Sequence, residues 1–132
     1  MINERFDFRD LFIFEMANNH QGQVEHGKRI IRDLAHVARS RGIRAAIKFQ
    51  FRQLDTMIHP AHQQDSSNKH IPRFLSTRLT KDQFGQLIEE VRKEGLTTIC
   101  TPFDEDSVNS VLELGVEVVK IGSCSATDWP LL

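Results

Sequence analysis

The chain has 132 residues, of which 39% are hydrophobic and 27% charged, and its formal net charge is -1. This is the composition of one soluble globular domain, and the near-neutral charge argues against a general nucleic-acid or membrane-surface binder, because such proteins usually carry a basic excess. No apolar run approaches the roughly 20 residues of a membrane span, and the charged N-terminus MINERFDFRD does not suit a signal peptide. We therefore expect a cytoplasmic protein.

Four β-rich segments alternate with helical patterns along the chain. The expected strands cover residues 11–16, 45–51, 96–103 and 116–123. Because parallel strands in one sheet need crossover connections, usually helices, this order predicts a mainly parallel sheet and an α/β fold.

Three helices are expected between these strands, and a fourth is expected to begin near Thr127 or Asp128. The first runs over 24–41 and is capped by Gly42, the second runs from a capping box at Thr80 to Gly95, and the third follows Asp104 and stops at Gly115. Their inward-facing residues are predicted to be Val24, Ile30, Ile31, Leu34 and Ala38, then Phe84, Leu87, Ile88 and Val91, then Val108, Val111 and Leu112.

The segment 52–79 reads as a long polar loop. Loops of this length inside compact domains are usually functional or disordered, and this one follows the carboxyl end of a strand, where parallel α/β sheets bind ligands. His59, His62 and His70 could be drawn as a metal cluster, but the stretch lacks helical periodicity, so we do not expect a metal site there.

The expected strand AAIKFQF places Lys48 and Gln50 on one face and the apolar residues Ile47, Phe49 and Phe51 on the other. An edge strand with one solvated face would explain this pattern. A second explanation comes from the other strands, because polar residues also fall at their ends. The residues in question are Glu15, Lys48, Gln50, Thr101, Lys120 and Ser123.

A buried lysine without an anionic partner is costly, so two lysines at strand ends favour a site for a phosphorylated or carboxylated small molecule. The alternative is that Glu15 and the lysines merely pair with one another. The two cysteines, Cys100 and Cys124, lie in strand-like segments without zinc-ligand spacing, so both are interpreted as reduced packing thiols.

The strand ends also carry motifs that resemble those of the sialic acid synthase family. The resemblance runs from about residue 11 to the end of the chain and rests on four motifs in order. These are Glu15-Met16-Ala17-Asn18-Asn19-His20-Gln21-Gly22, Lys48-Phe49-Gln50, Thr101-Pro102-Phe103-Asp104, and Lys120-Ile121-Gly122-Ser123 with Asp128-Trp129-Pro130-Leu131-Leu132.

The resemblance implies a phosphoenolpyruvate-dependent synthase on a parallel (β/α)8 barrel. Residues 1–132 would form the N-terminal portion of that single barrel domain, with about four β/α units, ending before strand five. The implied reaction joins phosphoenolpyruvate to an open-chain N-acylated aldose resembling N-acetylmannosamine, giving a sialic or related nonulosonic acid and phosphate. A divalent metal, commonly manganese, is implied with its ligands outside this chain, and relatives commonly form homodimers.

The resemblance also implies roles for individual residues. Lys48, Thr101, Lys120 and Ser123 match positions that hold phosphoenolpyruvate, and Glu15 matches an acidic residue close to the reacting centre, with a catalytic role. Gln50 and, in the long loop, Asn68 match sugar-contacting positions.

The sequence departs from the family pattern at one point, because Cys124 and Ser125 follow Ser123 where many relatives carry Gly-Glu. In the family, that glutamate is assigned a role in proton transfer.

Two alternative functions remain. One is another phosphoenolpyruvate or pyruvate aldolase-type barrel, in which Arg52, Arg73 or Arg78 would read a phosphorylated aldose. The other is a non-catalytic module that binds a sugar acid or phosphate.

Overall fold

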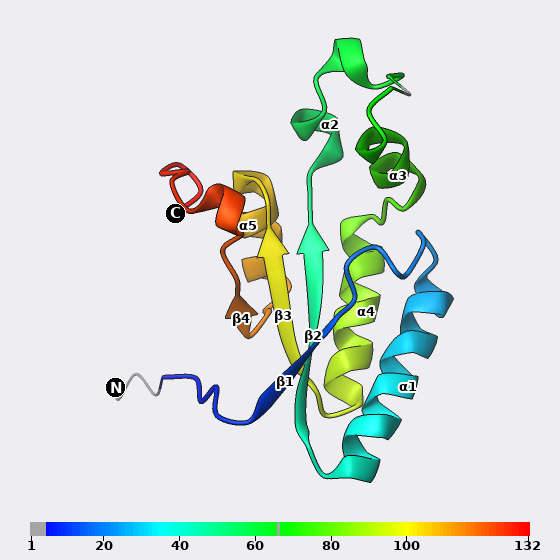
Figure 1. Ribbon diagram of the computed structural model, residues 1–132, viewed down its shortest axis with the longest axis vertical. Coiled ribbons are helices and arrows are strands. Elements are labelled where there is room, and N and C mark those ends of the chain that lie inside the picture. The colour runs from blue at the N-terminus through cyan, green and yellow to red at the C-terminus, as the bar shows by residue number, and fades with distance from the viewer. Residues whose placement is uncertain (1–4, 66) are drawn as a thin grey trace.

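The computed structural model describes residues 5–65 and 67–132, so residues 1–4 of the charged N-terminus lie outside the described part. Four parallel strands form one sheet in the order β1-β2-β3-β4 (Figure 1). They span Leu11–Glu15, Arg44–Phe51, Thr97–Pro102 and Val118–Val119. The predicted α/β fold with a parallel sheet is confirmed.

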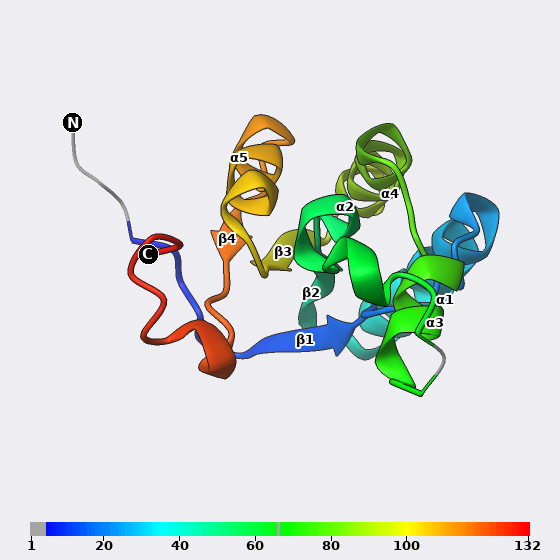
Figure 2. The same cartoon turned by 90° about the horizontal axis from the view of Figure 1, so that it is seen from above.

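Three helices cover one face of this sheet and lie on its convex side (Figure 2). They are α1, α4 and α5, which span Val24–Arg41, Lys81–Lys93 and Glu105–Glu113. On the sheet side of this layer, Ile47 and Phe49 of β2 are fully buried, and the Phe84 ring of α4 lies 4.4 Å from the Phe51 ring, measured between centroids. The apolar face of AAIKFQF therefore forms the core, as its alternation predicts.

The helix ends follow the local signals of the sequence. Gly42 adopts a left-handed conformation with φ of 60° after α1, and its N–H donates to the Arg39 carbonyl at 3.2 Å. At the start of α4, the Thr80 hydroxyl accepts from the Gln83 N–H and the Gln83 side chain accepts from the Thr80 N–H, which is the predicted capping box.

The inward stripe predicted for α4 is confirmed, but the stripe predicted for α5 is wrong at one position. Val111 is buried, whereas Leu112 is 61% exposed. The buried positions of α5 are Ser107 and Val111, and Leu112 lies about 100° further round the helix, on its exposed side.

The fourth strand is much shorter than the predicted 116–123. Its first residues pair through side chains instead of the backbone: the Thr98 N–H donates to the Glu117 carboxylate at 2.8 Å, and the Glu117 N–H donates to the Thr98 hydroxyl at 3.1 Å. The regular ladder therefore begins only at Val118. After it, the chain turns into a short 3-10 helix, η2 (Ser123–Ser125).

The segment 52–79 is not the structureless loop that its composition indicates. It contains three short helices, α2, η1 and α3, which span Leu54–Met57, Pro60–His62 and His70–Ser76. Leu54 and Ile58 are buried, so tertiary packing orders a stretch that has no helical periodicity of its own. Near the C-terminus the predicted helix start is a turn, in which the Asp128 carbonyl accepts from Leu131 and Leu132.

The concave face of the sheet carries exposed apolar side chains. Ile13 of β1 is 51% exposed and Phe8, which precedes it, is 59% exposed. Across the described residues, no helix combines the length and the apolar character that crossing a bilayer requires.

In the part of the chain that the structure describes, the concave face is exposed and no strand pairs with the outer edges of β1 and β4. We expect residues 1–132, expressed alone, to self-associate, because apolar surface and open strand edges favour association. The measurement is sedimentation velocity over a range of protein concentrations. Replacing Ile13 on the concave face with Gln should reduce association more than replacing Leu112 on the helix side, and a monomer with a sharply cooperative melt would contradict the expectation.

Candidate functional site

Glu15 and Lys48 face each other at the carboxyl ends of β1 and β2. The parallel register pairs them directly, and Glu15 Oε2 lies 2.5 Å from Lys48 Nζ. The ladder continues one residue further, because the Met16 N–H donates to the Lys48 carbonyl at 2.9 Å. The pairing of Glu15 with a lysine, one of the two possibilities left open by the sequence, is therefore present in the structure.

Lys120 joins this pair in one hollow on the concave face. Its N–H donates to the Cys100 carbonyl at 2.9 Å, which holds the Lys120 backbone beside β3 beyond the end of β4. The hollow has a volume of about 540 Å³ and is lined by Phe8, Ile13, Glu15, Lys48, Ile99, Val118, Val119, Lys120 and Ile121. Among the described residues, Lys120 has no carboxylate within 4.0 Å. The lining thus combines two lysines and one glutamate with apolar residues, a composition that favours a small anion.

Thr101, Gln50 and Ser123 lie at the adjoining strand ends. Thr101 pairs with Gln50 in the ladder and is buried, whereas Ser123 opens η2 and is exposed. A methyl group built on Gly122 would lie 3.7 Å from Thr101 Cγ2, so the turn that carries Ser123 passes close to Thr101. The structure therefore gathers six of the seven predicted site residues at the carboxyl ends of the strands.

Asn68 is the predicted site residue that lies apart. It lines a different hollow, among Met57, Ile58, His59, His62, Asp65, His70, Ile71 and Phe74. Its side-chain oxygen accepts from the His70 N–H at 3.0 Å at the start of α3. Within residues 5–65 and 67–132, no three His, Cys, Asp or Glu side chains gather as a metal site would require. His59, His62 and His70 therefore do not form a metal-ligand set in the structure.

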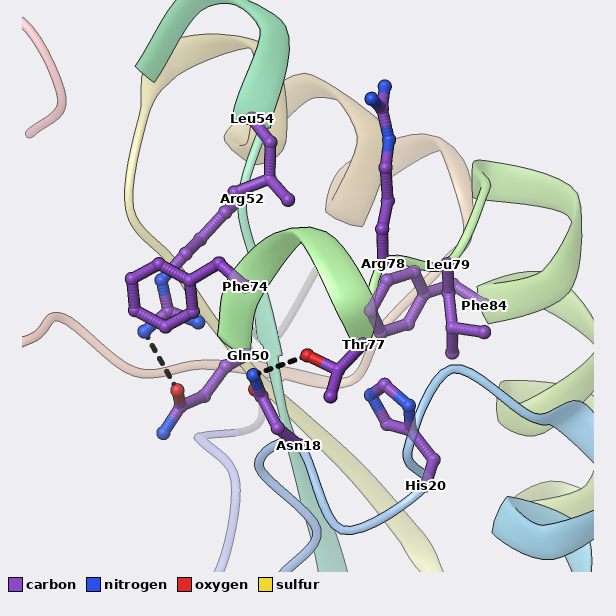
Figure 3. Close-up of a pocket in the computed structure, with 10 residues that line it drawn as sticks. All are labelled: Asn18, His20, Gln50, Arg52, Leu54, Phe74, Thr77, Arg78, Leu79 and Phe84. Carbon is purple, nitrogen blue, oxygen red and sulfur yellow. Dashed lines mark hydrogen bonds between the residues drawn. The ribbon is translucent and has the colours of Figure 1, made fainter. Parts of the chain in front are cut away.

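A third, smaller cavity, of about 30 Å³, lies between the end of β2 and the loop helices (Figure 3). Its lining comprises Asn18, His20, Gln50, Arg52, Leu54, Phe74, Thr77, Arg78, Leu79 and Phe84. A space of this size holds only a water molecule or two. The Arg52 Nη2 donates to Gln50 Oε1 at 2.8 Å, and burial, together with the nearby charge of Arg73, lowers the pKa of the Arg52 guanidinium.

The loop between β1 and α1 is tied to the end of α3. The Asn18 side chain donates to the Thr77 hydroxyl at 2.8 Å (Figure 3). Gly22 has φ of 72°, and a Cβ there would lie 3.0 Å from the Ser76 carbonyl oxygen, so a side chain would combine a strained backbone conformation with a tight contact. The motif of β1 therefore helps to hold α3 over the strand ends.

His20, in the same loop, is buried beneath this contact. Its Nδ1 accepts from the Gly22 N–H at 3.1 Å, so in the neutral ring the proton is carried by Nε2. Its ring packs edge-on against Phe84. Burial, with a smaller contribution from His26, lowers the pKa of His20 to about 4.

Two residues of this cavity, His20 and Arg52, are not among the seven predicted site residues, and Arg52 was named only as a phosphate reader for the alternative aldolase-type function. His20 belongs to the motif quoted for the end of the first strand, and Arg52 lies two residues after Gln50, on the same side of an extended chain. The alternation of side chains could therefore have pointed to Arg52, while nothing in the sequence indicates the burial of His20.

The cysteines behave differently from each other. Cys100 is buried in β3, and burial raises the pKa of its thiol to about 12, so it is the packing thiol that was predicted. Cys124 is exposed in η2, and the prediction is wrong for this residue. The physical reason is that the chain leaves the sheet after Lys120, so Cys124 has no strand neighbours to pack against.

The fold and the site define an α/β protein whose parallel strands end in a cationic mouth suited to a small anion. Residues 34–132 match the NeuB family. The chain belongs to this family, that of the sialic acid synthases, which confirms the resemblance read from the motifs.

Individual relatives agree with this assignment. The chain is 28% identical, over 91% of its length, to the N,N'-diacetyllegionaminic acid synthase of Legionella pneumophila and covers 35% of that protein. A crystal structure of a Chromobacterium violaceum protein assigned to spore coat polysaccharide biosynthesis as protein E is 46% identical, with a TM-score of 0.89 over 93% of this chain and 37% of that one. The N-acetylneuraminic acid synthetase of Leptospira borgpetersenii, solved with citrate, is 28% identical, with a TM-score of 0.70 over 92% of this chain and 39% of that one. The chain spans about a third of the length of the curated relatives it matches.

The lowered pKa of His20 makes the stability of the protein depend on pH. Below the ordinary pKa of 6.5 the unfolded chain binds a proton that the folded chain refuses until about pH 4. Stability is therefore lost as the pH falls between these values, by roughly 3 kcal/mol for a shift of this size. Urea unfolding of the full-length protein at pH 4.5 to 7 should show a steeper acid-side loss than in His20→Gln. Parallel profiles for the two proteins would contradict this prediction.

Proposed function

We propose that the protein condenses phosphoenolpyruvate with an open-chain N-acylated aldose to give a nonulosonic acid and inorganic phosphate. The observation that supports this most directly is the grouping of Glu15, Lys48 and Lys120 in one hollow at the strand ends. Relatives named as sialic acid and legionaminic acid synthases support the class of reaction.

At the three-carbon unit the proposed reaction forms a carbon–carbon bond and a bond from C2 to a water oxygen, and it breaks the bond from C2 to the phosphate oxygen; the aldehyde oxygen gains a proton and the added water loses one. C3 of phosphoenolpyruvate attacks the aldehyde carbon, which makes the new carbon–carbon bond. Water then adds at C2, and the bond from C2 to the phosphate oxygen breaks to release phosphate. Glu15, with its carboxylate beside Lys48, is the candidate for handling a proton at this centre.

The two lysines suit the charge of this substrate. Phosphoenolpyruvate carries close to three negative charges at neutral pH, and ammonium groups fixed at strand ends need little reorganisation to bind it. Lys48 would exchange part of its contact with Glu15 for the ligand, while Lys120, which has no carboxylate within 4.0 Å among the described residues, would give up no ion pair. Thr101 and Ser123 would add hydroxyl donors, and Gln50 would contact the sugar.

The exposed concave face supports a larger fold for the whole protein. We propose a (β/α)8 barrel of which β1 to β4 form part of the wall, because closure would cover side chains such as Ile13 and remove the open strand edges. The described residues gather no metal-ligand set. We propose that any manganese that the reaction needs is held by other parts of the protein.

The direct test is phosphate release from phosphoenolpyruvate by the full-length protein. We expect release only when an aldose acceptor is present, and we expect it to be stimulated by manganese. A panel should compare N-acetylmannosamine, its 6-phosphate and related N-acylated aldoses, with each aldose omitted in turn as the control. Binding of these compounds without any phosphate release would favour the non-catalytic module instead.

Lys120→Met tests the anion-binding role of the hollow. Losing one of two ammonium groups should lower kcat/KM for phosphoenolpyruvate by about tenfold or more, equivalent to about 1.4 kcal/mol. Lys93→Met is the matched control, because Lys93 ends α4 on the helix side of the sheet. Unchanged steady-state kinetics in Lys120→Met, or an equal loss in Lys93→Met, would remove Lys120 from the site.

A further inference from the structure

Arg52 sits in a stack of three side chains that come from three separate segments. Its guanidinium carbon lies 3.9 Å from the centroid of the Phe103 ring and 4.6 Å from that of the Phe74 ring. Phe103 follows β3 and Phe74 belongs to α3, so the stack joins the end of the sheet to the helix above it. Figure 3 shows the Phe74 ring beside the Arg52 guanidinium. In the described part of the chain no carboxylate lies within 4.0 Å of Arg52. The rings and Gln50 are its partners instead.

The contact with Gln50 settles the orientation of that amide. A guanidinium group only donates hydrogen bonds, so the atom facing Arg52 Nη2 must be the Gln50 oxygen, at 2.8 Å. The amide nitrogen is then turned away from Arg52 (Figure 3). Among the residues that the structure describes, this nitrogen donates to no partner.

We propose that Arg52 is a positioning residue that presents Gln50 to the sugar as an N–H donor. The group recognised at this point is then an acceptor oxygen, such as a hydroxyl or the carbonyl oxygen of an N-acyl group. The inference rests on the proposed function, in which Gln50 contacts the aldose. It also links the sugar subsite to the docking of α3, because Phe74 forms one side of the stack.

The same geometry disfavours Arg52 as a reader of a sugar phosphate. Two rings pack against its guanidinium, and its Nε is buried without a hydrogen-bond partner among the described residues. Arg78, another arginine on the loop, forms an ion pair with Asp55. One Nη2 donor of Arg52 is already used by Gln50, which leaves fewer N–H groups for a bidentate contact with a phosphate group.

A double-mutant cycle on the full-length protein tests the positioning role. Arg52→Met should raise KM for the aldose by about tenfold while KM for phosphoenolpyruvate changes by less than about twofold. In a Gln50→Ala background, Arg52→Met should cost less than about threefold more, since its effect acts through Gln50. Arg73→Met is the matched control, because Arg73 also contacts the Phe74 ring, at 5.4 Å, but not Gln50.

The cycle has outcomes that overturn the inference. If the fold-changes in aldose KM of the two single substitutions multiply in the double variant, Arg52 does not act through Gln50. The same conclusion follows if Arg52→Met raises KM equally for the aldose and for phosphoenolpyruvate. Should Arg52→Met fail to fold, Arg52→Lys keeps a donor for Gln50 without the planar stack. It should give an intermediate aldose KM, and an aldose KM unchanged from wild type would count against the stack.

Hydrogen exchange separates this inference from the proposed function. Amides of α3 should exchange faster in Arg52→Met than in Arg73→Met, because only the first loses the stack to the sheet. Absence of phosphate release by the wild-type protein would refute the proposed reaction but would not bear on the contact between Arg52 and Gln50. Equal exchange of α3 in both variants would overturn the role of Arg52, whether or not the protein is active.

Discussion

The parallel register of β1, β2 and β3 is the constraint on which the rest of the molecule depends. It sets Glu15 opposite Lys48 and Gln50 opposite Thr101, while Phe49 points to the opposite side. A slip of one residue would send Lys48 beneath the helices and bring Phe49 to the mouth. The burial of Phe49 under α4 therefore stabilises the same register that positions the polar residues. Core packing and site geometry are two consequences of one hydrogen-bonded ladder.

The sequence predicts the features that follow from periodicity and local capping. Alternation in AAIKFQF separates the core face from the site face, and the caps at Gly42 and Thr80 depend only on nearby residues. The short fourth strand could not be foreseen, because the Glu117 carboxylate replaces a backbone partner of Thr98. That contact joins residues nineteen positions apart and leaves no local pattern.

In the candidate site, too, the residues fixed by strand periodicity could be predicted, and those fixed by long-range contacts could not. Residues at strand ends could be predicted, since the carboxyl ends of parallel strands meet at one edge of the sheet. Asn68 could not be placed, because a loop position has no period to fix its direction, and in the structure its side chain supports the start of α3. The orientation of Gln50 depends on Phe74 and Phe103, which fold together only once α3 and β3 are in place.

The strand β2 sets the spacing between the two halves of the site. Lys48 and Gln50 point to the same side and lie two residues apart, which is about 6.6 Å along a strand. Lys48 stands in the cationic hollow beside Glu15, and Gln50 stands beside the drier stack under α3. An anionic reactant and a neutral sugar need these different surroundings, because charge favours the hollow and amide hydrogen bonds favour the stack. In the proposed reaction the new carbon–carbon bond would form between them, so a rigid buried strand is a suitable element to fix that separation.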